Sequence, residues 1–214
     1  MKNRILFLSL FLLLSAGVPA FADSLSFDVI NDNGCDDLSG QLAVDVAPYG
    51  TDQVLFTFTN NGEIASVIAA VYFDDTNGLL TNVGLIDKDD VGIYGEYGSA
   101  GVDFSMGGNP SDLPSGGNAG FFSDSTQTAD SPAPKNGINN NAGEWLGVYF
   151  DVASFEGVVN ALNIGDLRIG LHVTGIAPNG GSESYVNHVP EPTTIILLGT
   201  ALIGLAAIGR RRVR

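Results

Sequence analysis

Residues 53–73 read QVLFTFTNNGEIASVIAAVYF, and this stretch decides the fold class. Its apolar residues at positions 54, 56 and 58 share one face of an extended chain, because side chains alternate between the two faces of a strand. Asn60, Asn61 and Gly62 follow, and these are turn-forming residues. The stretch therefore predicts a β-hairpin, with strands at 53–59 and 64–73.

The second strand of this hairpin is apolar on both faces. From Val67 to Phe73 the residues are Val, Ile, Ala, Ala, Val, Tyr and Phe. Strands that are buried on both faces are typical of the middle of a sheet. We therefore expect the hairpin to form the centre of the sheet.

Short alternating runs broken by Gly, Asn, Asp and Pro continue on both sides of the hairpin, and only residues 155–162 keep a helical spacing. Residues 105–143 are rich in Gly and Pro, and we expect long ordered loops there around one short strand. Further strands are expected at 24–29, 42–46, 79–86, 102–104, 144–150, 167–173 and 182–186. The pattern predicts an all-β protein with a single β-sandwich, jelly-roll-like or immunoglobulin-like, over residues 23–188.

The N-terminus has the composition of a signal peptide. Lys2 and Arg4 precede an apolar run at 5–14, and the segment Ala20, Phe21, Ala22 places small residues at the two positions that signal peptidase reads. An uncleaved anchor is the alternative, but the apolar run is short for a membrane span. We expect cleavage before Asp23, which removes residues 1–22.

The C-terminus, VPEPTTIILLGTALIGLAAIGRRRVR (189–214), has three parts. First comes a strip that its prolines keep extended, made of Val189, Pro190, Glu191 and Pro192. Residues 193–209 are uncharged and apolar, as in a short transmembrane helix. Basic residues are retained on the cytoplasmic side of a membrane. In this chain the basic residues after the apolar run are Arg210, Arg211, Arg212 and Arg214, so we expect the tail on the cytoplasmic side.

This order of strip, helix and arginines resembles the PEP-CTERM sorting signal of Gram-negative bacteria over residues 189–214. The resemblance implies that exosortase, a membrane-embedded transpeptidase-like enzyme, recognises the strip 189–192 and removes the helix, so that the inner membrane holds the protein only transiently. It also implies an association with extracellular polysaccharide. A permanent tail anchor, the alternative, explains the helix and the arginines but not the strip.

The core resembles an ectodomain that recurs in PEP-CTERM proteins. The similarity lies in the stretches QVLFTFTNNG, IASVIAAVYFDD, NAGEWLGVYF and LRIGLHVTGI, with GGSESYVN after the last. It implies a β-sandwich that ends at the sorting signal and identifies no catalytic residue.

The core is strongly acidic. Residues 23–188 hold three of the nine basic residues and 23 of the 24 acidic residues, since Glu191 is the only acid in the two terminal segments. The formal charge of the core is therefore −20, against −15 for the whole chain. Such a field repels nucleic acid and anionic lipid and attracts cations. Solubility outside the cell is favoured as its role over dedicated metal binding, and no nucleic acid is expected as a partner.

Cys35 is the only cysteine, so an intramolecular disulfide is excluded. Neighbouring carboxylates at Asp32, Asp36 and Asp37 should raise the pKa of its thiol and lower its nucleophilicity. A catalytic thiol is not expected, while pairing between chains stays open.

We expect no enzyme. The sequence contains no GxSxG elbow, HExxH, phosphate-binding glycine loop or CxxC. His172 shares a strand face with Arg168, which predicts a solvated outer face, and His188 is expected in a flexible stalk.

Calcium is the one cofactor that the sequence leaves open, because it takes six to eight oxygens from loops. Two groups of loop aspartates supply such oxygens: Asp32, Asp36 and Asp37, and Asp87, Asp89 and Asp90. Neither group matches a twelve-residue calcium loop. Solvated turn aspartates are the favoured explanation.

The sequence thus predicts a non-enzymatic, exported surface or extracellular-matrix protein that signal peptidase and exosortase process and that associates with exopolysaccharide in a biofilm. The alternative is a calcium-assisted carbohydrate-binding module, to which Trp145 and Tyr149 would contribute exposed aromatic rings.

Overall fold

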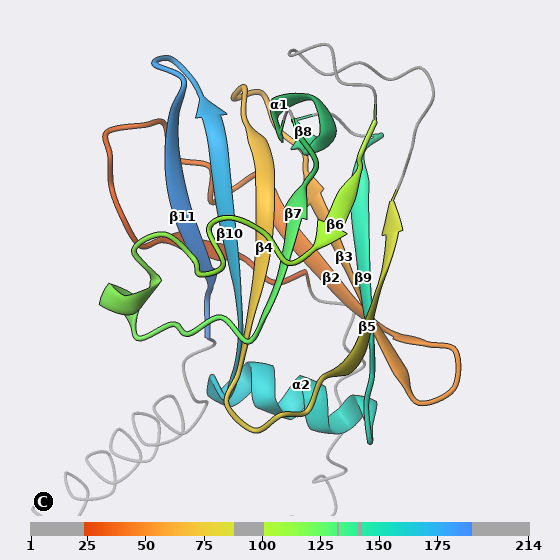
Figure 1. Cartoon of the computed structure of the whole chain (residues 1–214). Helices are drawn as coiled ribbons and strands as arrows, with labels where there is room; N and C mark the ends of the chain where they lie inside the picture. The colour runs from red at the N-terminus through yellow and green to blue at the C-terminus, as the bar shows by residue number, and fades with distance from the viewer. Residues whose placement is uncertain (1–23, 88–100, 132, 141–142, 190–214) are drawn as a thin grey trace, which may run out of the picture.

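The computed structural model describes residues 24–87, 101–131, 133–140 and 143–189. The chain is mostly β, and two antiparallel sheets face each other across a hydrophobic core (Figure 1). The larger sheet has the order β1 (Phe27–Val29), β11 (Gly181–Asn187), β10 (Leu167–Ile176), β4 (Val67–Asp75), β7 (Ser125–Ala129) and β6 (Phe104–Met106), with β8 (Ile138–Asn139) also paired to β4. The smaller sheet has the order β2 (Leu42–Tyr49), β3 (Gln53–Asn60), β9 (Trp145–Asp151) and β5 (Thr81–Asp87).

The expected hairpin between residues 53–59 and 64–73 is wrong. Both strands form, but β3 pairs with β2 and β9 in the smaller sheet, while β4 pairs with β10, β7 and β8 in the larger one. The chain therefore crosses from one sheet to the other at residues 61–66, so the two strands face each other across the core.

Asn60 explains why no tight turn forms. Its side chain is fully buried, and its Nδ2 donates to the carbonyl oxygens of Ser66 (3.1 Å) and Ile138 (3.2 Å). Gln41 Nε2 donates to Asn60 Oδ1 (2.9 Å) and to Ser66 Oγ (2.9 Å). These bonds satisfy buried polar groups at the crossing, so Asn60 joins the two sheets instead of starting a hairpin turn.

Aromatic rings fill the middle of the core. Phe73 of β4 contacts Phe56 of β3 and Phe150 of β9, with ring centroids 5.0 and 4.9 Å apart and near-perpendicular planes. Phe58 adds a further edge contact to Phe73 at 6.1 Å. Such edge-to-face pairs stabilise beyond the area they bury.

The region 105–143 contains more regular structure than the single expected strand. Besides β7 and β8 it holds the last residues of β6, a 3₁₀ helix η1 (Gly116–Ala119) and the short helix α1 (Ala133–Asn136). Leu113 and Phe121, on either side of η1, pack against Ala70 and Tyr72 of β4. The loop at 107–123 thus covers the outer face of the larger sheet, which is why β4 is buried on both faces.

The expected helix at 155–162 is present as α2 (Phe155–Ile164), which lies across one end of the sandwich (Figure 1). Ser154 caps it, because its Oγ accepts a hydrogen bond from the backbone nitrogen of Gly157 (2.9 Å). Val158, Ala161 and Leu162 are buried and close the core at this end.

Within the described residues, no helix has the length and apolar character needed to cross a membrane. The expected signal peptide at 1–22 and the expected membrane helix at 193–209 lie outside the described residues.

Candidate functional site

The sorting strip begins directly where the sandwich ends. Strand β11 ends at Asn187, which pairs with Phe27 of β1. The backbone nitrogen of His188 donates to Ser26 O (2.8 Å), and His188 Nδ1 lies 2.9 Å from Asp28 Oδ2. His188 is therefore tied to β1 and does not begin the flexible stalk that the sequence predicted.

Val189 is the last described residue, and it too lies against the sandwich. A Cβ placed on Gly165, which follows α2, would stand 3.4 Å from Val189 Cγ2. Pro190, Glu191, Pro192 and the four arginines of the tail lie outside the described residues.

The first described residues lie at the same end of the sandwich as the last ones. Ser24 is the first described residue, Leu25 forms a bridge with Val44, and Ser26 accepts the bond from His188. Ala20, Phe21 and Ala22 lie outside the described residues. The antiparallel pairing of β1 with β11 thus makes the chain enter and leave the sandwich side by side, beside α2.

The side chains of the loop aspartates accept hydrogen bonds from nearby backbone nitrogens and so stabilise turns. Asp32 Oδ1 accepts from Gly34 N (2.8 Å), and Asp37 Oδ1 accepts from Ser39 N (2.9 Å). Hydrogen bonds from Ser39 lower the pKa of Asp37. In the second group, Asp87 Oδ1 accepts from Phe104 N (3.2 Å), while Asp89 and Asp90 lie outside the described residues. No three metal-ligating side chains cluster in the described part of the chain.

Cys35 lies against β11. Its backbone nitrogen donates to Glu183 Oε1 (3.3 Å), and its Sγ is so close to Gly181 that a Cβ there would stand 2.6 Å away. Burial is the largest cause of the raised pKa of the thiol, and the carboxylates of Glu183, Asp32 and Asp36 raise it further. The raised pKa was expected from the sequence. Its chief causes, burial and Glu183, were not, because Glu183 is distant in sequence.

The face of β10 that carries Arg168 and His172 is covered, not freely solvated as expected. A Cβ on Gly170, between them, would stand 2.8 Å from Leu113 Cδ2 and 3.0 Å from Phe121 Cζ, because the loop at 107–123 lies on this face. Burial lowers the pKa of His172.

Arg168 holds this loop in place. Its guanidinium binds the Asp74 carboxylate and the carbonyl oxygens of Ala119 (3.1 Å) and Gly120, and it lies 5.4 Å from the centroid of the Phe121 ring. These contacts occupy one of the few basic groups of the core in a structural role.

The outer face of the smaller sheet carries the aromatic residues that the sequence singled out. Trp145 and Tyr149 are half-buried there, and Tyr49, which is 37% exposed, lies with its ring centroid 5.4 Å from that of Tyr149. Leu55 of β3 is opposite Tyr149, and Ile86 of β5 is opposite Gly147. We call these five side chains the aromatic face: Tyr49, Leu55, Ile86, Trp145 and Tyr149.

Two glycines make the aromatic face flat. A Cβ on Gly84 would stand 2.1 Å from Tyr149 Cζ, so the ring occupies the space directly above this glycine. A Cβ on Gly147 would stand 3.1 to 3.2 Å from Leu55, Ile86 and Trp145, which close over it. The aromatic rings therefore lie across the sheet surface instead of pointing away from it. The sequence suggested the rings but not the glycines, whose role depends on strand register.

Amide and carboxylate groups border the aromatic face at one end. Asp151 accepts hydrogen bonds from Gln53 Nε2 (2.7 Å) and Asn82 Nδ2 (2.9 Å), and Thr81 Oγ1 donates to its backbone carbonyl (3.1 Å). The bonds from Gln53 and Asn82 lower the pKa of Asp151, so this exposed carboxylate is ionised at neutral pH.

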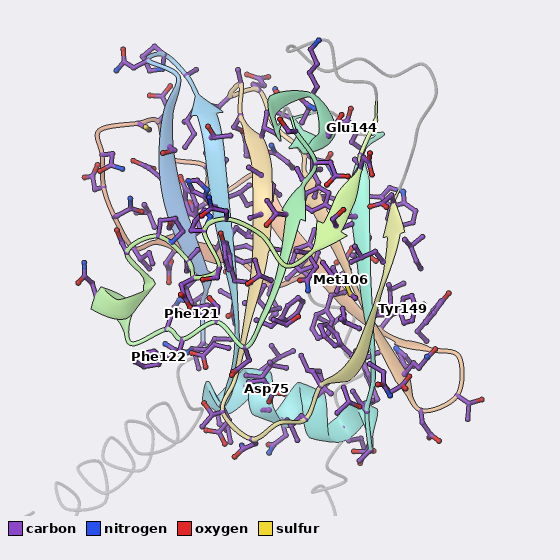
Figure 2. The ribbon with its side chains drawn as sticks, in the orientation of Figure 1. Asp75, Met106, Phe121, Phe122, Glu144 and Tyr149 are labelled. Carbon is purple, nitrogen blue, oxygen red and sulfur yellow. The ribbon has the colours of Figure 1, made fainter. Side chains whose placement is uncertain are left out.

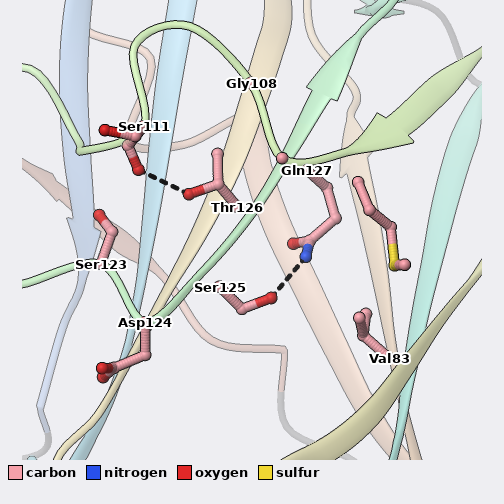
Figure 3. A pocket seen from close by; sticks show the side chains of 10 residues that line it. Val83, Gly108, Ser111, Ser123, Asp124, Ser125, Thr126 and Gln127 are labelled. Carbon is pink, nitrogen blue, oxygen red and sulfur yellow. Dashed lines mark hydrogen bonds between the residues drawn. The ribbon is translucent and has the colours of Figure 1, made fainter.

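A second feature is an open groove of about 380 Å³ beside the end of β6 (Figure 3). Its polar side chains bond to groups within the groove: Thr126 Oγ1 donates to Ser111 O (2.7 Å) and Gln127 Nε2 donates to Ser125 Oγ (2.7 Å). Gln127 Oε1 has no partner among the described residues, but it is buried below the surface. The bond between Thr126 and Ser111 joins β7 to the loop at 107–123 along this groove.

Comparison with known proteins identifies the C-terminal segment. Residues 188–212 match the family described as PEP-CTERM protein-sorting motif. No curated protein and no solved structure matches the chain. The chain thus carries a PEP-CTERM sorting motif, as the strip, apolar run and arginines predicted.

Proposed function

We propose that this protein is a non-enzymatic surface or extracellular-matrix protein that a Gram-negative cell exports, sorts through exosortase and retains in its exopolysaccharide layer. The observation that carries the proposal is the PEP-CTERM protein-sorting motif at residues 188–212, placed directly after the last strand of the sandwich.

Each terminal segment has one step in this route. Signal peptidase cleaves after Ala22 and frees the N-terminus outside the inner membrane. Residues 193–209 then hold the protein in that membrane, and the arginines at 210–212 and 214 keep the tail in the cytoplasm. Exosortase recognises Pro190, Glu191 and Pro192 and separates the sandwich from its membrane helix.

The fold suits this order of events. Every described strand is complete by Asn187, so removal of the membrane helix takes nothing from the core. The high negative charge keeps the released sandwich soluble.

A structural role fits the ionisable groups inside the sandwich. Glu183 accepts bonds from the backbone nitrogens of Asn33 and Cys35, and Glu144 accepts from the backbone nitrogen of Asn139 (2.7 Å). His172 lies on the outer face of β10 with a pKa lowered by burial, and His188 is tied to Asp28 of β1. These groups fix the chain path, which supports a non-enzymatic protein.

Intact-mass analysis tests the sorting step. In cells with exosortase, we expect the exported protein to lack residues 1–22 and the apolar segment 193–209, whereas cells without exosortase should retain the segment. A triple variant, with Pro190, Glu191 and Pro192 all replaced by alanine, should keep it in both strains. A wild-type protein that keeps residues 193–209 in the presence of exosortase would contradict the proposal and identify a permanent anchor.

A further inference from the structure

The two sheets of the sandwich differ in what lies on their outer faces. The larger sheet is covered by the loop at 107–123, whose Leu113 and Phe121 are buried against it. The smaller sheet leaves the aromatic face partly open to solvent, with Tyr49 37% exposed. Figure 2 shows Tyr149 on the β5 side of the molecule and Phe122 on the far side, near the loop that crosses β10 and β11.

The chemistry of the aromatic face fits a sugar ring. A pyranose presents C–H groups on its flat faces, which pack on aromatic rings, and hydroxyl groups on its edge, which need hydrogen-bond partners. Tyr149 and Trp145 supply rings that lie across the sheet, since Gly84 and Gly147 leave room for them. Gln53, Asn82 and Asp151 supply amide and carboxylate groups at the border.

The charged residues around the aromatic face limit which class of polysaccharide can bind to it. Of the three basic residues of the core, Lys135 and Arg168 lie on α1 and β10, away from the smaller sheet, and Lys88 lies outside the described residues. Asp45 and Asp151 flank the aromatic face instead. Anionic glycans are therefore repelled, and so is a second copy of this core, which carries the same charge of −20.

We propose that the aromatic face binds a neutral polysaccharide, with sugar rings stacked on Tyr149 and Trp145 and hydroxyl groups bound by Gln53, Asn82 and Asp151. This inference deepens the proposed function, because it names the surface that would hold the sorted protein in a polymer layer. No calcium is part of this site.

The protein contains one tryptophan, Trp145, so intrinsic fluorescence reports on this face directly. The full chain, in a detergent without sugar headgroups, is titrated with hydroxyethylcellulose, dextran and alginate in the presence of a chelator. We expect at least one of the two neutral polymers to shift the emission to shorter wavelength in a saturable way, and the anionic alginate to leave it unchanged.

Three variants separate binding from folding. Tyr149→Ala removes a stacking ring and should weaken polymer binding about tenfold or more. Phe122→Ala is the matched control, because Phe122 is 70% exposed and lies off the face. Gly84→Ala keeps every ring but places a methyl group where the far end of Tyr149 lies, so the ring must swing outward and binding should fall while the chain still folds.

Three results would overturn the proposal. The first is unchanged emission with both neutral polymers. The second is equal loss of binding in Tyr149→Ala and Phe122→Ala. The third is a dimer in sedimentation analysis that Tyr149→Ala dissociates, since this would make the face a contact between copies. The titration uses no exosortase, so its outcome is independent of the mass test of sorting.

Discussion

Asn60 determines which strands lie side by side. Its side-chain Nδ2 donates to the carbonyl groups of Ser66, just before β4, and of Ile138 in β8, while its Oδ1 accepts from Gln41. A buried amide that is bonded on both sides is costly to remove, because its partners lose hydrogen bonds that water cannot replace. The crossing at 61–66 thus depends on a buried polar cluster of Asn60, Gln41 and Ser66.

We expect Asn60→Ala to lower the free energy of unfolding by about 2 kcal/mol, since it leaves several buried polar groups without partners. Urea unfolding followed by the fluorescence of Trp145 measures the change. Asn61→Ala is the matched control, because Asn61 is exposed, and it should change stability by less than about 0.5 kcal/mol. Equal stability of the two variants would show that the bonds around Asn60 do not hold the crossing.

The same residue shows where prediction from the sequence stops. Periodicity identified β3 and β4 as strands, because alternation and apolar content are local properties. Asn-Asn-Gly, however, is compatible with a tight turn and with a crossing, and the choice depends on Gln41 and Ser66, which only the folded chain brings to Asn60. The role of Gly84 and Gly147 could not be predicted from the sequence either. It depends on the strand register that places Tyr149, Leu55 and Ile86 over them.

Among the elements, the loop at 107–123 departs most from expectation. Its composition is that of an exposed loop, yet Leu113 and Phe121 are buried and Arg168 binds its backbone at Ala119 and Gly120. A few apolar residues are enough to bury a loop when a neighbouring strand offers an apolar face, as β4 does with Ala70 and Tyr72. A periodicity search does not detect such isolated contacts.

The burial of His172, on the face of β10 that this loop covers at Gly170, predicts a pH dependence of stability. Its pKa is lowered in the folded protein, so below about pH 6.5, the ordinary value for histidine, the unfolded chain binds the proton more readily than the folded one. The contribution of His172 to stability is therefore complete above the unfolded pKa and is lost as the pH falls through the folded pKa.

Urea midpoints at pH 7.5 and pH 5.5 test this expectation. The midpoint of the wild-type protein should fall more between these pH values than that of His172→Gln, whose side chain does not titrate. Both proteins lose the contributions of carboxylates at lower pH, so the comparison of the two removes that common effect. Equal decreases in the two proteins would mean that His172 is open to solvent in the folded protein.

At the scale of the whole molecule, the positions of the two ends of the sandwich predict how it is oriented relative to a membrane. β1 and β11 are antiparallel neighbours, so the chain enters and leaves at the end that carries α2. The four residues 189–192 span at most about 14 Å when extended. While the apolar segment is held in a membrane, the α2 end must therefore stay close to the bilayer, and the turn at 177–180 lies a full strand length away, about 30 Å.

Cells that lack exosortase allow this orientation to be measured, because the protein keeps its apolar segment there. Asn160 on α2 and Asn179 in the far turn are both exposed, and each can be changed to cysteine for fluorophore labelling in a Cys35→Ser background. In isolated inner membranes, a quencher attached to lipid headgroups should reduce the emission of the probe at position 160 more strongly than that at 179. Equal quenching would mean that the sandwich lies on its side or tumbles freely, so that the pairing of β1 with β11 does not set its orientation. A probe found only in the soluble fraction would instead contradict the membrane-held stage itself.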